Sequence, residues 1–195
     1  MADGNKMTKW EDIMHLPDER RPELIAGKEH FRAAPRTRHG FGAHRVSVAV
    51  DPATRRNEAT GWWICQEPDI ALSDTTYLRP DLAGWRKVRM PELTDEWPTR
   101  LPPDWVCEIL SPSNAVYDRR DKASEFARAG VPWLWLVDPQ ERLVEVFKLR
   151  HDEELGNRWL LVGVYGADAV QALPPFEDVV VQVGDLFAPL AASVA

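Results

Sequence analysis

A short apolar run with one acid at its centre constrains the fold of this chain more than any other feature. Residues 104–110 read Asp-Trp-Val-Cys-Glu-Ile-Leu, so Glu108 has apolar neighbours on both sides. A run of this length and character is typical of a β-strand that is buried on both faces. A carboxylate there costs on the order of several kcal/mol unless it is paired, protonated or bound to a metal. The sequence therefore indicates a buried strand in which Glu108 has a partner or a role.

A helix and further strands follow this run. Residues 116–129 predict the clearest helix of the chain, with Gly130 where a helix commonly ends and Pro132 just beyond. Residues 133–137, Trp-Leu-Trp-Leu-Val, predict a second buried strand. The remaining expected elements are a hairpin over 143–150 and 158–164, strands at 61–66, 68–73, 78–85 and 179–183, and a short terminal helix.

Capping and turn signals predict two helices and a hairpin in the N-terminal part of the chain. Thr8 and Glu11 have capping-box spacing, which predicts a first helix that ends near Pro17. Residues 22–34 predict a hairpin that turns near Gly27. Residues 37–57 predict a second helix, although its two glycines weaken it.

The order of these elements predicts an α/β (α+β) fold, in which helices flank a mixed β-sheet and additional β-hairpins are attached. The 195 residues are enough for one domain, so we expect a single domain over 1–195 with a flexible N-terminus at 1–7. Residues 86–103 carry four prolines, but apolar residues are interleaved among them. We interpret this segment as an ordered excursion rather than a linker.

Composition narrows the class of protein. With 44% hydrophobic and 28% charged residues, the chain has the profile of a folded globular protein. It has neither an apolar stretch of the roughly 18 residues that a membrane span needs nor an N-terminal signal segment. We therefore expect no membrane association and a cytoplasmic location. The 2 cysteines make no disulfide framework, and no Cys/His cluster has zinc-ligand spacing.

The net charge of −7 argues against tight non-specific binding to nucleic acid, because proteins that bind it by charge alone are usually strongly basic. One segment is much more basic than the rest of the chain. Residues 32–56 contain one acid, Asp51, and six arginines: Arg32, Arg36, Arg38, Arg45, Arg55 and Arg56. The segment is either a phosphate-contacting surface or simply a solvated helix face.

Two residues elsewhere join Glu108 as candidates. Asp81 follows Pro80 in the strand that precedes the excursion, although Asp69 follows Pro68 in the same way and the dipeptide does not choose between them. On a helical wheel Lys122 falls within the apolar stripe of helix 116–129, which aims it at the strand of Glu108. Lys122 could instead form an i,i+4 pair with Asp118.

Asp81, Glu108 and Lys122 together form a chemical unit. Two carboxylates on adjacent strands can bind Mg²⁺, with the main-chain carbonyl of Ile109 as a third ligand. A bound metal polarises a scissile phosphate and lowers the pKa of a water molecule. Lys122 would then orient that water or stabilise negative charge in the transition state.

The chain resembles the Uma2 family of the PD-(D/E)XK nuclease superfamily over roughly residues 8–190. The matching segments are Glu23–Gly27, His39, Arg79–Trp85, Val106–Ser113, Tyr117–Asp118 with Lys122, and Gly130–Pro139. The resemblance implies a restriction-endonuclease-like fold, Asp81 and Glu108 as metal ligands, and Lys122 as the catalytic lysine. It also implies Glu23 as an accessory acid near the metal, with Asp118 and His39 as further accessory residues.

Two positions depart from the expected pattern. The superfamily's lysine usually follows the acid by two residues, where this chain has Leu110; the family places it on the following helix, in agreement with the helical wheel. Lys28 stands where family members often carry an acid, which leaves the role of Glu23 open. His39 can equally be a structural or surface histidine.

The leading hypothesis is therefore an endonuclease that depends on Mg²⁺, with Mn²⁺ as a substitute, and that hydrolyses phosphodiester bonds, with DNA as the expected partner. The alternatives are a catalytically silent nucleic-acid-binding module and a purely structural ion pair between Glu108 and Lys122. Many nucleases of the superfamily act as homodimers, but the sequence identifies no interface. It also leaves open DNA against RNA, strand and sequence specificity, and biological role.

Overall fold

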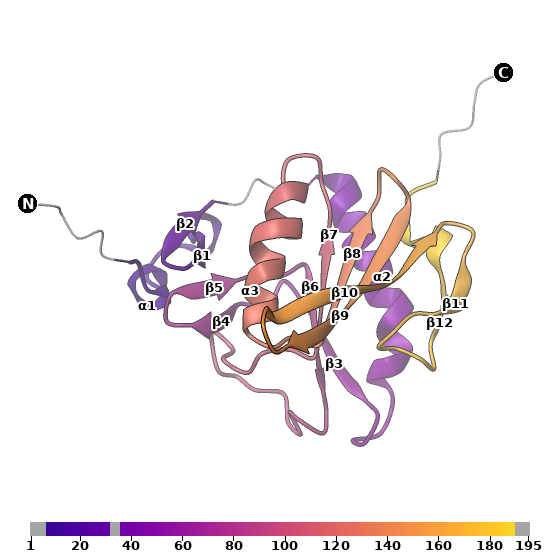
Figure 1. Ribbon diagram of the computed structural model, residues 1–195, viewed down its shortest axis with the longest axis horizontal. Coiled ribbons are helices and arrows are strands. Elements are labelled where there is room, and N and C mark those ends of the chain that lie inside the picture. The colour runs from indigo at the N-terminus through magenta and orange to yellow at the C-terminus, as the bar shows by residue number, and fades with distance from the viewer. Residues whose placement is uncertain (1–6, 32–35, 190–195) are drawn as a thin grey trace, which may run out of the picture.

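A six-stranded sheet forms the centre of the computed structural model, which describes residues 7–31 and 36–189 (Figure 1). Its strand order is β10-β9-β8-β7-β6-β3. Strands β7 and β8 are parallel and the other neighbours are antiparallel, so the predicted mixed sheet is confirmed. The strands span β3 (Trp62–Gln66), β6 (Leu82–Arg86), β7 (Trp105–Ile109), β8 (Trp133–Asp138), β9 (Leu143–Asp152) and β10 (Gly156–Gly166).

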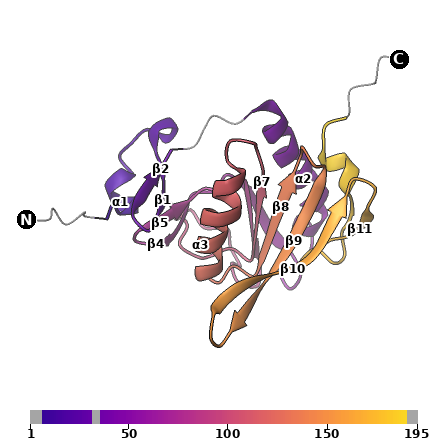
Figure 2. The ribbon, with the colours of Figure 1, turned by 45° about the horizontal axis from the view of Figure 1, so that its top comes forward.

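Helices cover both faces of this sheet (Figure 2). Parallel strands need a crossover connection, and the segment between β7 and β8 supplies it through η2 (Tyr117–Lys122) and α3 (Ala123–Arg128). Its Phe126 packs with Val106 on one face of β7. On the opposite face, α2 (Thr37–Thr54) packs Val46 against Ile109. All five residues of β7 are buried, as the sequence predicts.

The helix predicted over 116–129 has the expected end but an unexpected interior. Gly130 ends it with a φ of 77°. Residues Tyr117–Lys122, however, form a π-helical turn, in which the N–H of Ala123 donates to the carbonyl of Asp118, five residues earlier. Such turns are rare and frequently occur at functional sites.

A smaller sheet lies beside the central one, with strand order β2-β1-β5-β4 (Figure 1). It confirms the predicted hairpin, whose residues 32–34 lie outside the described part of the chain. Its strands are β1 (Glu23–Ile25), β2 (Lys28–His30), β4 (Ile70–Ser73) and β5 (Thr76–Leu78).

The strand predicted over 78–85 is wrong, because the structure divides it between the two sheets. Strand β5 ends at Leu78 and β6 begins at Leu82, so Arg79, Pro80 and Asp81 link one sheet to the other. Pro80 has no backbone N–H and cannot donate to a sheet ladder, which favours a break at this point. The break leaves Asp81 at the end of β6 rather than inside a strand.

The first helix is shorter than predicted and is capped differently. Helix α1 (Trp10–Ile13) begins after Lys9, whose N–H donates to Asp12 Oδ2 at 3.0 Å. Thr8 Oγ1 bonds instead to Glu29, 3.4 Å away on β2, because the hairpin lies next to it. The turn η1 (Asp18–Arg20) follows Pro17.

The C-terminal part adds one unpredicted strand. Strand β12 (Val180–Gln182) and the turn η3 (Val183–Leu186) confirm the expected last strand and short helix, and β12 pairs with β11 (Val170–Ala172). After Arg86, the last residue of β6, residues 87–103 form no regular strand, although Thr99 bridges to Ile70. Within the described ranges, no helix is long and apolar enough to cross a membrane. The predicted flexible N-terminus falls almost entirely on residues 1–6, outside those ranges.

Candidate functional site

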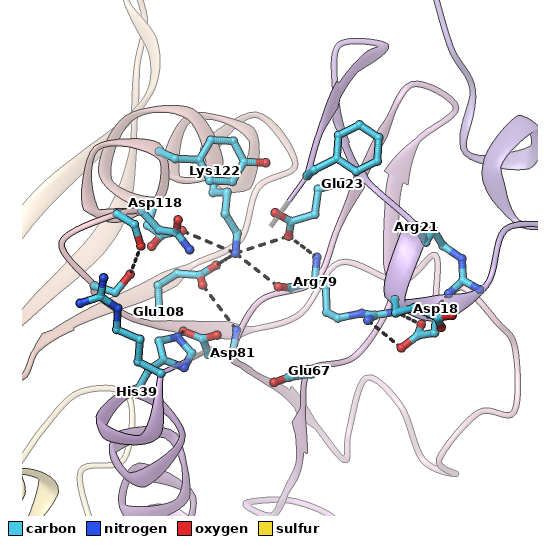
Figure 3. Close-up of a pocket in the computed structure, with 17 residues that line it drawn as sticks. Asp18, Arg21, Glu23, His39, Glu67, Arg79, Asp81, Glu108, Asp118 and Lys122 are labelled. Atoms are coloured by element: carbon cyan, nitrogen blue, oxygen red, sulfur yellow. Dashed lines mark hydrogen bonds and ion pairs between the residues drawn. The ribbon is translucent and has the colours of Figure 1, made fainter. Parts of the chain in front are cut away.

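A cavity of about 490 Å³ lies where the link between the two sheets meets β7, η2 and the first turn of α2 (Figure 3). The sequence candidates line it together: Glu23, His39, Asp81, Glu108, Asp118 and Lys122. They come from five separate segments of the chain, from β1 to η2, which supplies both Asp118 and Lys122. The fold therefore brings together residues that are far apart in sequence.

Asp81 and Glu108 are neighbours across two strands. The antiparallel register pairs Leu82 with Cys107, and extending it by one residue places Asp81 opposite Glu108. The N–H of Asp81 lies 3.4 Å from Glu108 Oε2. Asp81 Oδ2 accepts a hydrogen bond from the N–H of Ile109 at 2.6 Å. In an extended strand the N–H and C=O of one residue point to the same side, so the Ile109 carbonyl also faces Asp81.

Lys122 projects from η2 onto the same point. Its Nζ lies 2.7 Å from Glu108 Oε1, and it donates to the carbonyl of Arg79 at 3.3 Å. Glu108 is 1% exposed and Lys122 3% exposed. The helical wheel thus predicted the direction of Lys122 correctly, and the i,i+4 contact with Asp118, at 3.8 Å, is the longest of its ion pairs.

Glu23 and Asp118 add two more carboxylates around the same ammonium. Glu23 Oε1 accepts from the N–H of Arg79 at 2.8 Å and lies 3.5 Å from Lys122 Nζ. Burial raises the pKa of Asp118 to about 6, although Lys122 opposes this shift. Burial also raises the pKa of Glu108 well above its ordinary range, again against the effect of Lys122.

The charges of this cluster are not balanced. Burial alone would lower the pKa of Lys122, but Glu108, Glu23 and Asp118 raise it well above its ordinary value, so the lysine stays protonated. One ammonium then faces these three acids together with Asp81. The cluster therefore holds more acid than Lys122 can neutralise, and it favours a proton or a further cation.

His39 lies inside the site, not on the surface. Its Nε2 is 3.0 Å from Asp81 Oδ2. The hydrogen bond to Asp81 raises the pKa of the His39 imidazole, although burial opposes this shift. His39 Nε2 and the N–H of Ile109 thus both contact the same oxygen of the Asp81 carboxylate, Oδ2.

Asp69, the local rival of Asp81, belongs to a different cluster. It accepts hydrogen bonds from Tyr77 at 2.5 Å, from Arg79 Nε at 2.6 Å and from Trp97 at 2.7 Å. These bonds lower the pKa of Asp69 although burial opposes them. Arg79 also binds Asp18 through both terminal nitrogens, so its side chain is fixed while its backbone contacts Glu23 and Lys122 (Figure 3).

The arginine-rich segment is largely engaged within the protein. Arg45, Arg55 and Arg56 pair with Asp185, Asp51 and Asp178, at 3.6, 2.5 and 3.6 Å. Arg36 lines the cavity, and Arg32 lies outside the described residues. Within residues 36–56, these internal pairs leave fewer arginines for the first of the two alternatives, a phosphate-contacting surface.

Sequence reasoning missed two contributors. The Arg79 main chain, which touches both Glu23 and Lys122, carries no signal in a sequence. Tyr117 lines the cavity and stacks on His30, with ring centroids 3.5 Å apart and an interplanar angle of 8°. Its position directly before Asp118 in a family-like segment was the available signal.

The donor set fits a hard divalent cation that keeps most of its water. In the parts of the chain that are described, no group of three or more His, Cys, Asp or Glu side chains is placed to hold a metal ion. Mg²⁺ does not require one, since it is usually bound through one or two carboxylates and several waters. Glu108 Oε1 is buried and lies 2.7 Å from Lys122 Nζ. A carboxylate oxygen has two lone pairs, so it can accept a second partner beside the lysine.

Comparisons with known proteins identify the fold and the family of this chain. The structure is similar to the crystal structure of a "putative nuclease belonging to DUF820" from Anabaena variabilis, with a TM-score of 0.69 and 20% sequence identity over 91% of this chain and 96% of that chain. This likeness shows a shared fold. No curated protein matches the sequence. The family model described as "Uma2: Putative restriction endonuclease" matches residues 10–184, nearly the whole chain, and the chain therefore belongs to the Uma2 family.

Proposed function

We propose that this protein is a metal-dependent endonuclease that hydrolyses phosphodiester bonds in DNA, with the acid–acid–lysine site of the PD-(D/E)XK superfamily. One observation carries the proposal: Lys122 and Glu108 form a buried contact of 2.7 Å directly beside Asp81, in a cavity open to a ligand. Membership of a family described as restriction endonucleases supports the same reaction.

Asp81 and Glu108 would hold Mg²⁺ or Mn²⁺, together with the Ile109 carbonyl. When bound, the metal supplies Lewis-acid activation of the phosphate and of a water molecule. His39 keeps the Asp81 carboxylate oriented, as partners behind a metal ligand generally do.

Lys122 would act on the reacting groups through its charge. Its raised pKa keeps the ammonium protonated at neutral pH, so it serves as a hydrogen-bond donor and not as a base. A donor fixed by Glu108 and the Arg79 carbonyl can orient the attacking water or a phosphate oxygen without reorganisation. Glu23 and Asp118 hold the same ammonium in place from the other side.

Supercoiled plasmid DNA tests the proposal. The wild type is expected to nick it in Mg²⁺ or Mn²⁺ and not in EDTA. Asp81→Asn and Glu108→Gln should each lower the rate by at least about 100-fold, since residues that act as a unit fail together. Glu141→Gln, at an exposed turn, is the matched control and should cleave normally.

Calorimetric titration with Mn²⁺ separates the remaining alternatives. We expect binding that Asp81→Asn and Glu108→Gln abolish. Cleavage that survives either substitution would refute the assignment of the site. Neither cleavage nor metal binding would instead support a silent nucleic-acid-binding module.

A further inference from the structure

The groups proposed to react lie at the bottom of a small cavity, which limits the shape of the substrate. Glu108 and Lys122 are almost completely buried, so a phosphate can reach them only by entering the cavity. A volume of about 490 Å³ is that of a pocket for a small ligand. Intact duplex DNA, whose major groove alone is about 12 Å wide, is far larger. Enzymes that bind a nucleotide base within such a pocket to react with it act on single strands or on extruded nucleotides.

An exposed aromatic ring stands beside this cavity. Phe31 lines it and is nevertheless 65% exposed. Its position follows from its neighbour His30, whose ring stacks on Tyr117 of η2 and so attaches the end of β2 to the wall of the cavity. An exposed ring next to a polar cavity offers a face on which an unpaired base of any identity can stack.

The charge of the chain also favours an unpaired strand over a duplex. Duplex binding depends mainly on Lys and Arg side chains that neutralise phosphates. Here the net charge is −7, and three of the arginines of 36–56 are paired with acids of the same chain. Stacking on an aromatic ring needs no net positive charge and can supply affinity where Coulomb attraction is weak.

We propose that the cavity takes an unpaired DNA strand, with one base stacked on Phe31 and the adjacent phosphate directed to Glu108 and Lys122. This inference rests on the proposed nuclease function for the reaction, but the stacking contact can be tested without cleavage. It assigns Phe31 as a substrate-contacting residue. Intact duplex would then be cut only where a strand frays or is displaced.

Cleavage of one labelled oligonucleotide in two forms tests the substrate class. In Mn²⁺ the single strand should be cut at least about tenfold faster than the same strand fully annealed to its complement. Phe31→Ala should raise KM for the single strand about tenfold and leave kcat nearly unchanged, and Phe31→Trp should restore KM. Phe41→Ala is the matched control, since Phe41 is an exposed phenylalanine of α2 outside the cavity lining. Equal rates on the two forms, or an unchanged KM in Phe31→Ala, would overturn the proposal.

A fluorescent base separates failure of this inference from failure of the nuclease proposal. Single-stranded DNA that contains 2-aminopurine should be quenched on binding to the wild type in EDTA, where no metal supports cleavage. Phe31→Ala should lose the quenching and Phe31→Trp should keep it. Quenching without any cleavage in Mn²⁺ would refute the nuclease and retain the stacking site. Cleavage in Mn²⁺ without Phe31-dependent quenching would retain the nuclease and refute the stacking site.

Discussion

At the scale of single residues, Lys122 decides whether the acidic cluster is tolerable in a folded protein. It is the ammonium that Glu108, Glu23 and Asp118 share, at 2.7, 3.5 and 3.8 Å. Removing one partner of a buried pair is much worse than removing both, because an uncompensated buried charge remains. The cluster should therefore respond very differently to single and paired substitutions.

Lys122→Met is expected to lower the free energy of unfolding at pH 7 by about 3 kcal/mol or more, as for other broken buried pairs. Adding Glu108→Gln should recover a large part of the loss, because one of the stranded carboxylates is gone. Urea denaturation measures both, with Lys28→Met on the exposed face of β2 as a control. A loss below about 1 kcal/mol for Lys122→Met would show that water or protons compensate the cluster instead.

Asp118 predicts a pH dependence whose sign follows from its raised pKa. Its ordinary value is 3.8 and the folded value is about 6, so between these limits the folded state keeps a proton that the unfolded state has lost. Stability contributed by Asp118 is therefore present below about pH 4 and is lost as the pH rises to 6. Asp118→Asn mimics the protonated form.

Asp118→Asn should match the wild type near pH 4 and exceed it at pH 7 by about 3 kcal/mol, on the scale of 1.36 kcal/mol per pKa unit. Urea denaturation at the two pH values gives the difference. Asp95→Asn, in the exposed excursion, should change neither value. Equal stability of Asp118→Asn and wild type at pH 7 would contradict the raised pKa.

The sequence reveals a site residue when its residue type is costly at its predicted position. It does not reveal a residue whose role depends only on tertiary contacts. Glu108 was identifiable because a carboxylate in a buried strand is costly, and Lys122 because it interrupts an apolar helix stripe. Asp81 and Asp69 looked equivalent as Pro-Asp dipeptides. Only the pairing of β6 with β7 places Asp81 beside Glu108, while Tyr77 and Arg79 bind Asp69 elsewhere.

At the scale of elements, the π-helical turn of η2 sets the direction of the catalytic candidates. A π turn amounts to one extra residue in a helix, so it rotates the residues before it relative to those after it by roughly 100°. Tyr117 and Asp118 precede the turn's end, and Lys122 closes it. The helical wheel could aim Lys122 at the sheet, but it could not foresee the turn, which has no sequence period of its own.

Deletion of the exposed Arg120 should restore regular α-helical bonds while turning Tyr117 and Asp118 away from Lys122. We expect the helix content measured by circular dichroism to persist and the cleavage rate to fall by about 100-fold, the usual effect of misplacing reacting groups by about 1 Å. Arg120→Ala keeps the backbone and should retain activity. A deletion variant that cleaves at more than about a third of the wild-type rate would show that the turn is incidental.

The elements themselves were predictable where hydrophobic period and turn chemistry agreed. Strands β7 to β10 and the helix that Gly130 ends follow from such patterns. The segment 78–85 is predicted as one strand, although Arg79, Pro80 and Asp81 interrupt its apolar residues. Its division between two sheets depends on tertiary contacts, because β5 and β6 both pair with strands distant in sequence.

At the scale of the whole molecule, the distribution of charge limits how nucleic acid could be bound. The chain carries −7 net charge, its cavity is rich in acids, and several of its arginines serve internal pairs. Three of the five arginines of 36–56 are paired with acids, which leaves few of them to form a basic face for DNA. Under the proposed function, affinity would then come from few phosphate contacts, from base stacking and from the metal.

This balance predicts a weak dependence of single-strand binding on salt. Each phosphate neutralised on a single strand contributes about −0.7 to the slope of log K against log salt. Arg36 and Lys122 are cavity residues able to meet phosphate, so a slope between about −1 and −2 is expected. Fluorescence anisotropy of a labelled single strand in EDTA between roughly 20 and 200 mM NaCl measures it, with Arg36→Gln expected to make the slope shallower by about 0.7. A slope steeper than about −4 would reveal a larger basic surface and would favour duplex binding over a stacked, unpaired strand.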